Sequence, residues 1–195
     1  MKITLCMIVL NEEECIERSL NSIIPYVDDA VIIDGGSTDN TLEILSRFNV
    51  KIIHNAWADN YSIQRNLSLT FAESEWIFVL DADEYVLPYV GENLRNLINT
   101  DYDSFTFIYK NFLDGKLTNL LWYDSHIKLF RNYCKFEGRY HEQLTGYKNL
   151  GTSNLDIYHD KKLVWQQKDN EHYWDLGQLP PPGWVKECGV WIRME

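Results

Sequence analysis

Short apolar runs separate longer amphipathic stretches along the first hundred residues of the chain. Runs typical of strands occupy residues 3–10, 30–34, 51–54 and 76–81. A continuous apolar run such as ITLCMIVL (residues 3–10) indicates a strand that is covered on both faces. The remaining runs share this character, so we expect a sheet buried between two layers.

Apolar side chains recur at helical spacing in each interval between these runs. Asn11 is predicted to cap the first helix, with Glu14 as its capping-box partner. The second helix opens at the turn formed by residues 35–38, the third spans residues 60–72, and the fourth begins at Pro88. Strands that alternate with helices predict an α/β fold with a mostly parallel sheet and right-handed crossovers.

The second half of the chain follows another pattern. Residues 104–112 and 126–131 are rich in aromatic and β-branched side chains and predict β structure, with a turn at residues 114–116. We therefore expect an α/β half over residues 1–100 and a β-rich half of the same domain over 101–160. Residues 161–195 form a Trp- and Pro-rich tail.

Three of the predicted strands end in polar residues. Asn11 and Glu12 follow the first, residues 34–37 follow the second, and residues 81–84 follow the fourth. Ligands in open α/β sheets bind beyond the carboxyl ends of the strands. We therefore expect one binding site built from these three segments.

Composition narrows the class of protein. The chain has 195 residues, 45% of them hydrophobic, which suits one domain with a small appendage. A net charge of −11 argues against nucleic acid as an electrostatically bound partner. The four cysteines form no C-x-x-C pair, and no apolar run approaches the ~20 residues of a membrane-spanning helix. With no signal-peptide pattern either, the sequence predicts a cytoplasmic protein that is at most peripheral at a membrane.

Asp81 and Asp83 form a D-x-D motif directly after the fourth strand. Alternate positions of an extended chain face the same way, so both carboxylates can point to one spot. Oxygen ligands of this kind suit Mg²⁺ or Mn²⁺, which bridge protein and phosphate oxygens. The alternative is a pair of solvated aspartates in a turn.

Asp34 precedes two glycines that would let a ligand approach the backbone closely. Its carboxylate can accept hydrogen bonds from a base or a ribose. The segment matches neither a dinucleotide fingerprint nor a P-loop. The alternative is a structural turn in which Ser37 or Thr38 caps the next helix.

Four motifs together resemble the family-2 glycosyltransferases, which have a GT-A fold. They are VLNE (9–12), IDGGSTDNT (33–41), QRN (64–66) and LDADE (80–84), in the order and approximate spacing of that family. The resemblance implies a Rossmann-like three-layer fold with a mostly parallel central sheet and a small β-rich acceptor-side region. Residues 1–100 would then bind the nucleotide sugar, and residues 101–160 would face the acceptor.

The resemblance also assigns roles to individual residues. It implies a nucleoside site, contacts to the ribose and diphosphate, and a divalent metal, Mn²⁺ or Mg²⁺, with Asp83 as its main ligand. Arg65 would lie near the diphosphate, although the residues alone also allow an exposed helix cation. The other contacts to the nucleotide-sugar donor expected in this way come from Leu10, Asn11, Glu12, Asp34, Gly35, Asp81 and Ala82, and Asp81 is also a possible metal ligand.

A weaker resemblance continues through FEGRYHEQL (136–144), which is similar to the bacterial branch that includes lipopolysaccharide-core glucosyltransferases. An inverting transfer needs a base for the acceptor hydroxyl, and Glu142 is the candidate. The alternative for Glu142 is a structural ion pair with Arg139 or Lys135. Asp124 and Glu84 are rival bases.

A late histidine closes the metal shell in many GT-A enzymes. His159 is the candidate here, and His141 is the second, although a single histidine is often structural. Four basic residues could neutralise the leaving diphosphate or lie on the solvated side of a strand. They are Lys128, Arg131, Lys135 and Arg139.

The predicted function is inverting, metal-dependent transfer of a sugar from a nucleotide sugar, with UDP implied by the resemblance, to a hydroxyl acceptor in glycan or polysaccharide biosynthesis. The acceptor would be a glycan, a lipid-linked sugar or another hydroxyl compound. One alternative is a nucleotidyltransferase acting on sugar phosphates, although the acidic loop at residues 11–14 would repel a triphosphate. The other is a nucleotide-sugar-binding module without turnover.

Overall fold

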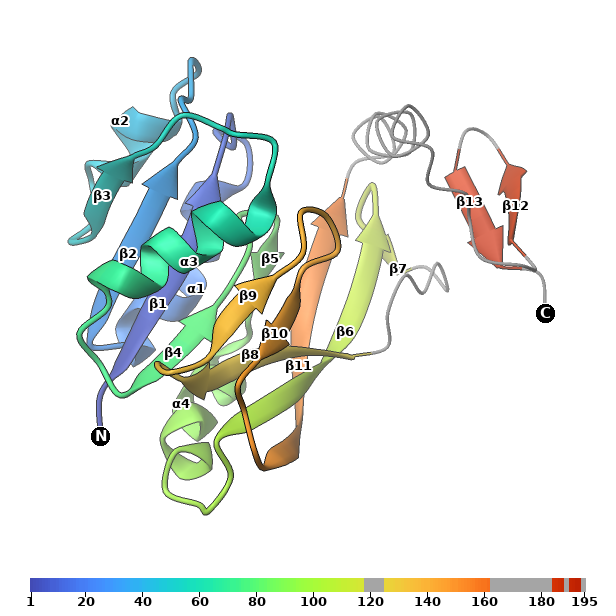
Figure 1. Ribbon diagram of the computed structural model, residues 1–195. Helices are drawn as coiled ribbons and strands as arrows, with labels where there is room; N and C mark the ends of the chain where they lie inside the picture. Colours follow the sequence, from blue (N-terminus) through green and yellow to red (C-terminus); the bar gives the residue numbers. More distant parts are fainter. Residues whose placement is uncertain (118–124, 162–183, 188–189, 194–195) are drawn as a thin grey trace.

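A computed structural model describes residues 1–117, 125–161, 184–187 and 190–193 (Figure 1). The central sheet has the order β3-β2-β1-β4-β8-β6-β11-β5, with β7 paired to β6. Its strands are β1 (Ile3–Val9), β2 (Asp29–Asp34), β3 (Lys51–His54), β4 (Trp76–Val79), β5 (Glu84–Tyr85), β6 (Ser104–Leu113), β7 (Lys116–Leu117), β8 (Ser125–Arg131) and β11 (Leu150–Lys161).

The first four strands of the order are parallel, as the sequence predicts. The sheet becomes mixed beyond them, because β8 runs antiparallel to both β4 and β6, and β5 runs antiparallel to β11. Two small antiparallel sheets complete the described strands: β9 (Lys135–Glu137) with β10 (Gln143–Thr145), and β12 (Trp184–Glu187) with β13 (Val190–Arg193). The proposed division at residues 100 and 160 remains a prediction.

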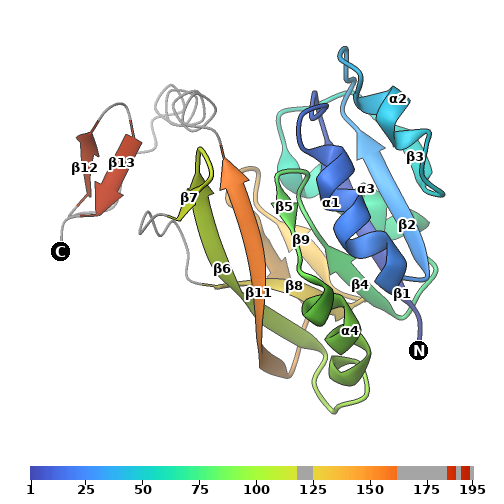
Figure 2. The same ribbon diagram turned by 180° about the vertical axis from the view of Figure 1, so that it is seen from behind.

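Helices cover both faces of the parallel part of the sheet. The helix α3 (Tyr61–Phe71) and the β9–β10 pair lie on one face (Figure 1), and α1 (Ile16–Ile23) and α4 (Pro88–Leu97) lie on the other (Figure 2). The other described helices are the 3₁₀ turn η1 (Ile24–Tyr26) and α2 (Thr41–Leu45). Among the described residues, no helix is long and apolar enough to cross a membrane.

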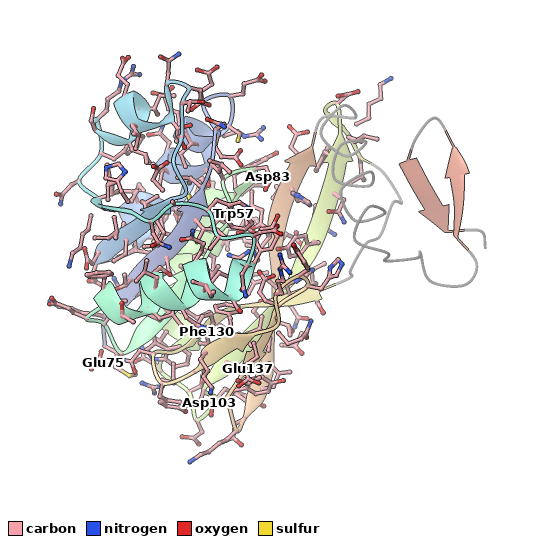
Figure 3. The ribbon with its side chains drawn as sticks, turned by 45° about the horizontal axis from the view of Figure 1, so that its top comes forward. Trp57, Glu75, Asp83, Asp103, Phe130 and Glu137 are labelled. Atoms are coloured by element: carbon pink, nitrogen blue, oxygen red, sulfur yellow. The ribbon has the colours of Figure 1, made fainter. Side chains whose placement is uncertain are left out.

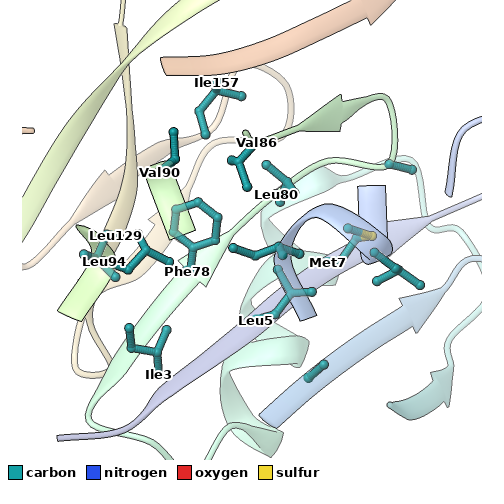
Figure 4. Packing of buried hydrophobic residues seen from close by; sticks show 14 of the residues in the cluster. Ile3, Leu5, Met7, Phe78, Leu80, Val86, Val90, Leu94, Leu129 and Ile157 are labelled. Carbon is teal, nitrogen blue, oxygen red and sulfur yellow. The ribbon is translucent and has the colours of Figure 1, made fainter. Parts of the chain in front are cut away.

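Alternation along β1 explains its unbroken apolar run. Leu5 and Met7 belong to the cluster under α1 and α4, which Figure 4 shows, whereas Cys6 belongs to the cluster under α3. Because both faces of the sheet are covered around β1, its side chains are buried whichever way they point, except for the half-buried Ile8.

The predicted cap of the first helix is wrong. The helix begins at Ile16, and Cys15 occupies the N-cap without a side-chain hydrogen bond. Asn11 has a φ of +58°, and its Oδ1 accepts a hydrogen bond from the backbone N–H of Thr38 at 2.7 Å. Asn11 therefore joins two loops, and Glu14 lies before the helix rather than at its third position. The predicted third helix is capped by Asn60, whose side chain accepts a hydrogen bond from the backbone N–H of Ile63 at 3.2 Å.

Gly91 allows α4 to pack closely on η1. A Cβ at this position would lie 2.1 Å from Cδ2 of Tyr26, far inside the contact distance of two carbons. Helix propensity alone would favour alanine over glycine by ~1 kcal/mol. The close contact with Tyr26, and not helix propensity, therefore explains the glycine at position 91.

We predict that Gly91→Ala lowers the free energy of unfolding by about 1–3 kcal/mol, because the added methyl overpacks the contact with Tyr26. Urea denaturation would measure the loss. Asn96→Ala, at an exposed position of the same helix, should cause no comparable loss. A Gly91→Ala variant as stable as the parent would contradict the packing argument.

Candidate active site

The polar residues that follow β1, β2 and β4 lie at one end of the sheet. Parallel pairing sets Val9 beside Asp34 and Cys6 beside Val79, so the loops after these strands leave from the same edge. Figure 3 shows Asp83 at this end of the molecule, with Glu75 and Asp103 toward the other. The three loops therefore lie at one edge of the sheet, as the sequence predicts, and their role as one binding site remains a prediction.

The loops after β1 and β2 are joined by hydrogen bonds. The backbone N–H of Asn11 donates to Ser37 Oγ at 3.0 Å, and that of Glu12 donates to Thr41 Oγ1 at 2.7 Å. The backbone N–H of Thr38 donates back to Asn11 Oδ1. The two loops therefore form one continuous wall.

Asp34 anchors this wall at the end of β2. Its buried carboxylate accepts hydrogen bonds from the backbone N–H groups of Gly36 and Ser37, both at 3.1 Å. Gly36 has a φ of +105°, which explains the glycine. Burial acts to raise the pKa of Asp34, but hydrogen bonds from Ser37, His54 and Gly36 bring it below its usual range. The carboxylate is therefore held ionised.

The predicted alternative of a helix cap at Ser37 or Thr38 is wrong. The N-cap of α2 is Asn40, and its side chain makes no capping hydrogen bond. Gly35 lies against β1, where an added Cβ would be 3.3 Å from the carbonyl oxygen of Val9. The turn is thus shaped by Asp34 and the glycines.

Arg65 projects from α3 into a buried group of charges. Its Nη1 lies 2.8 Å from Asp81 Oδ1, and its Nε donates to Glu142 Oε1 at 2.5 Å. The guanidinium is 11% exposed, so the alternative of an exposed helix cation is wrong. Burial acts to lower the pKa of Arg65, but the carboxylates of Asp81 and Glu142 outweigh it and raise that pKa above its usual range. Arg65 is therefore a permanent cation shared by two carboxylates.

The ion pair of Glu142 differs from the alternative considered in the sequence. Arg139 pairs with Asp59, and Lys135 lies 3.2 Å from Glu137. Glu142 pairs instead with Arg65, which lies 77 positions earlier. A side chain on the β9–β10 connection thereby reaches the end of β4.

Lys128 supplies the second buried cation. It projects from β8, and its Nζ lies 2.6 Å from Glu84 Oε2 and 3.5 Å from Asp81 Oδ2. Burial disfavours its charge, but Asp81 and Glu84 raise its pKa. The prediction that Lys128 lies on a solvated strand face is wrong, because only 4% of the residue is exposed.

Glu84 is engaged on several sides. It accepts hydrogen bonds from Lys128, from the hydroxyl of Tyr109 and, at 2.9 Å, from the backbone N–H of Asp81. Glu84 was a rival candidate for the base, and this buried position instead makes it a support for the D-x-D turn. The other rival, Asp124, lies outside the described residues.

We call Arg65, Asp81, Lys128, Glu84 and Glu142 the charge cluster. Its two cations lie among three carboxylates. The pKa of Asp81 shows the effect: burial raises it, but Arg65 and Lys128 lower it far more. Removal of either cation would leave buried negative charge without compensation.

Asp83 contacts another partner. The strand β4 ends at Val79, and the D-x-D motif lies in a turn closed by a hydrogen bond from the Glu84 N–H to the Asp81 carbonyl at 3.0 Å. Asp83 Oδ2 lies 3.1 Å from Nε2 of His159, whose Nδ1 lies 2.9 Å from Asn111 Oδ1. Asp81 faces the cations while Asp83 faces His159.

Pairing of β5 with β11 brings His159 to this turn, because His159 lies opposite Glu84 in the register. His141, the second histidine considered, lies on the exposed connection between β9 and β10. Among the described residues, no group of three or more His, Cys, Asp or Glu side chains forms a ready metal centre. The structure thus brings together Asp83 and His159 as a pair.

Several residues at this end have no signal in the sequence patterns. Tyr109 and Asn111, from β6, reach Glu84 and His159, whereas the sequence pattern predicts only a β segment for them. Trp57 packs edge-on against Tyr61, with ring centroids 4.8 Å apart, and its backbone N–H donates to the Gly35 carbonyl at 2.9 Å.

Comparison with known proteins gives a consistent result. The family model described as glycosyl transferase family 2 matches residues 4–154. A TPR repeat-containing protein of Synechococcus elongatus is 34% identical over 184 residues, which cover 93% of this chain and 41% of that protein. The prophage-derived glycosyltransferase SunS of Bacillus subtilis is 29% identical over 81% of this chain and 39% of its own length. The chain thus spans about two-fifths of these relatives.

Solved structures share the fold. TarS of S. aureus (residues 1–349) superposes with a TM-score of 0.61 and 17% identity, covering 88% of this chain and 63% of that one. Glucosyl-3-phosphoglycerate synthase of Mycobacterium tuberculosis, determined with Mn²⁺ and UDP-glucose, gives a TM-score of 0.57 and 16% identity, covering 95% and 83%. The predicted GT-A fold is confirmed.

We predict that Lys128→Met lowers the free energy of unfolding by about 3–5 kcal/mol, because it leaves the buried Glu84 and the half-buried Asp81 beside an apolar side chain. Chemical denaturation at neutral pH would measure the change. Lys110→Met is the matched control, since Lys110 is 43% exposed and its contact with Asp156 is 3.7 Å long. That control should lose at most ~1 kcal/mol. Equal losses of unfolding free energy in Lys128→Met and Lys110→Met would contradict the argument that burial makes the Lys128 ion pairs important.

Proposed function

The chain belongs to glycosyl transferase family 2, and from this premise we propose that it transfers a sugar from a nucleotide-sugar donor to an acceptor hydroxyl. One observation supports the proposal above the rest: the charge cluster and the Asp83–His159 pair lie at the same edge of the sheet as the wall made by the loops after β1 and β2. An anchored wall, buried cations and a metal-binding pair are the parts that a nucleoside diphosphate requires.

The nucleoside would lie against the wall. Its contacts would come from Leu10, Asn11, Glu12 and the Asp34–Gly35 turn. Asp34 already accepts hydrogen bonds from its own turn, so its role would be to fix the shape of the wall and to accept from the ligand. Uridine is the proposed base, because TarS was determined with UDP and UDP-GlcNAc and the mycobacterial synthase with UDP-glucose.

The diphosphate would lie over Asp81 and Ala82, next to Arg65. Arg65 carries a fixed charge in a partly dry site, where its interaction with phosphate oxygens is stronger than in water. Lys128 adds a second positive charge behind Asp81. These cations offset the charge of the departing diphosphate.

The residues present fit a divalent metal. Asp83 Oδ2 and His159 Nε2 are 3.1 Å apart, so both can reach one ion. Asp81 could join them through Oδ2, whose 3.5 Å separation from Lys128 is the loosest contact of the charge cluster. Such ions complete their shell with phosphate oxygens and water. The mycobacterial synthase was determined with Mn²⁺. When bound, the metal would supply Lewis-acid stabilisation of the leaving group.

The proposed reaction is a direct displacement with inversion. The acceptor oxygen forms a bond to the anomeric carbon while the bond from that carbon to the diphosphate oxygen breaks. The hydroxyl proton passes to Glu142, and the nucleoside diphosphate leaves. Arg65 holds Glu142 through Oε1, which orients the carboxylate toward the site. Diphosphate binding would draw on the same guanidinium and so weaken its hold on Glu142.

The acceptor and the cellular place stay open to experiment. We propose a glycan, lipid-linked or other hydroxyl acceptor, and a cytoplasmic location with at most peripheral contact to a membrane. A nucleotidyltransferase and a binding module without turnover are the alternative outcomes. A panel of nucleotide sugars and triphosphates, tested for metal-dependent thermal stabilisation and for turnover, separates the three.

We predict that Asp83→Ala abolishes transfer and Mn²⁺-dependent binding of UDP, because it removes half of the Asp83–His159 pair. Calorimetric titration of UDP with Mn²⁺ or with EDTA, alongside a donor-hydrolysis assay, measures both effects. Asp101→Ala, an exposed acid distant in sequence, serves as the control. Wild-type turnover in Asp83→Ala would rule out this metal site.

We predict that Glu142→Gln lowers kcat by about 10²–10⁴-fold while UDP binding is retained, because glutamine keeps an oxygen for Arg65 but cannot take the proton. Steady-state kinetics with a donor sugar and its acceptor would show the change. Glu137→Gln alters an exposed glutamate on β9 and should leave kcat unchanged. An unaffected kcat in Glu142→Gln would exclude it as the base.

A further inference from the structure

Asn111 holds the ring of His159 on the side opposite Asp83. The two residues face each other across the parallel strands β6 and β11. Asn111 Oδ1 lies 2.9 Å from Nδ1, and Asp83 Oδ2 lies 3.1 Å from Nε2. The imidazole is therefore set between two oxygen atoms.

Asn111 is itself buried, with 9% of the residue exposed. Its Nδ2 is enclosed and has no hydrogen-bond partner among the residues that the structure describes. A buried amide without a partner costs about 1–3 kcal/mol, so it calls for an explanation. A role for the other end of the amide, at His159, provides one.

These contacts restrict where the proton of a neutral His159 ring can lie. Both flanking oxygens are acceptors, and a neutral imidazole has a single N–H. If Nδ1–H donates to Asn111, the lone pair of Nε2 meets the carboxylate of Asp83. A cation bound by both Nε2 and Asp83 removes the repulsion in this arrangement.

The rotated amide would have the opposite effect. Its Nδ2 would donate to Nδ1 of His159, and the ring proton would then lie on Nε2 and be donated to Asp83. No lone pair would remain for a metal. Tyr109 also contacts the ring, edge-to-face at 5.9 Å between centroids, but it offers Nδ1 no acceptor in that contact. The orientation of the Asn111 amide thus selects the tautomer that can bind a metal.

We propose that Asn111 is a positioning residue for the metal site: its Oδ1 accepts the Nδ1 proton of His159 and so presents Nε2, beside Asp83, to a divalent cation. This role rests on the proposed function, because it concerns the metal that the transfer would use. Partners of this kind behind a metal-binding histidine fix the tautomer and the direction of the ring.

The test compares Asn111→Leu with Asn111→Asp. Leucine has a similar size and no acceptor, whereas aspartate keeps the acceptor. Mn²⁺ binding in the presence of UDP is measured by electron paramagnetic resonance of the free ion. Asn111→Leu should weaken Mn²⁺ binding by about 10–100-fold, and Asn111→Asp should stay within about threefold of the parent or bind more tightly. Asn96→Leu, on the exposed side of α4, should bind as the parent does.

A second measurement reports the ring directly. In ¹⁵N-histidine-labelled protein with Mg²⁺ and UDP, the His159 signal, identified by its loss in His159→Gln, should show a proton on Nδ1. A proton on Nε2 would overturn the proposal. If Asn111→Leu does not fold, Asn111→Ala takes its place, with the thermal midpoint measured for each variant and rescue by aspartate still required.

Equal Mn²⁺ affinity in the parent and Asn111→Leu overturns the proposal, as does a parent that binds no Mn²⁺. The outcome is separate from that of the transfer reaction. Donor turnover without metal binding would leave the glycosyltransferase function intact and remove the role of Asn111. The expected affinities without turnover on any nucleotide sugar would keep the positioning role and count against transfer.

Discussion

The buried charge cluster is the interaction on which the site depends. Arg65, Lys128, Asp81, Glu84 and Glu142 come from α3, β8, the D-x-D turn, β5 and the β9–β10 connection, and each lies within reach of an opposite charge. Taking such groups out of water is costly, and only close pairing offsets that cost. The cluster is therefore weak evidence for stability but a strong constraint on geometry, since each element must be in place for its neighbours to stay charged.

The sequence predicted the parts of the fold that depend on local pattern. Buried strands and amphipathic helices leave a period in the chain, and the three polar strand ends follow from parallel topology. The partners across the mixed half of the sheet leave no such sign. Lys128 looks like any basic residue on a strand, and Asn111 like any polar one, until β8 and β6 are placed beside β4 and β11. The predicted helix cap at Asn11 is wrong for a related reason: the side chain of Asn11 accepts a hydrogen bond from Thr38, a partner in another loop.

The two sides of the site differ in how they are built. The wall between the β1 and β2 loops is made of backbone hydrogen bonds to short side chains, so it is formed before any ligand arrives. The side that holds the charge cluster is made of charges shared among several partners. Arg65 serves both Asp81 and Glu142, and a phosphate group would compete for it. The preformed wall and the charge cluster, whose ion pairs can rearrange, therefore come from different segments around one sheet.

The pairing of β5 with β11 also bears on when the contact between Asp83 and His159 can form during folding. Asp83 and His159 are 76 positions apart, and the pairing of β5 with β11, which also pairs with β6, brings them together. Contacts this distant along the chain form late, because the entropy of loop closure must be overcome before they contribute any free energy. As the chain leaves the ribosome, the wall between the β1 and β2 loops can be complete while the Asp83–His159 pair does not yet exist. The Asp83–His159 pair is thus a property of the assembled sheet and of no single segment of the chain.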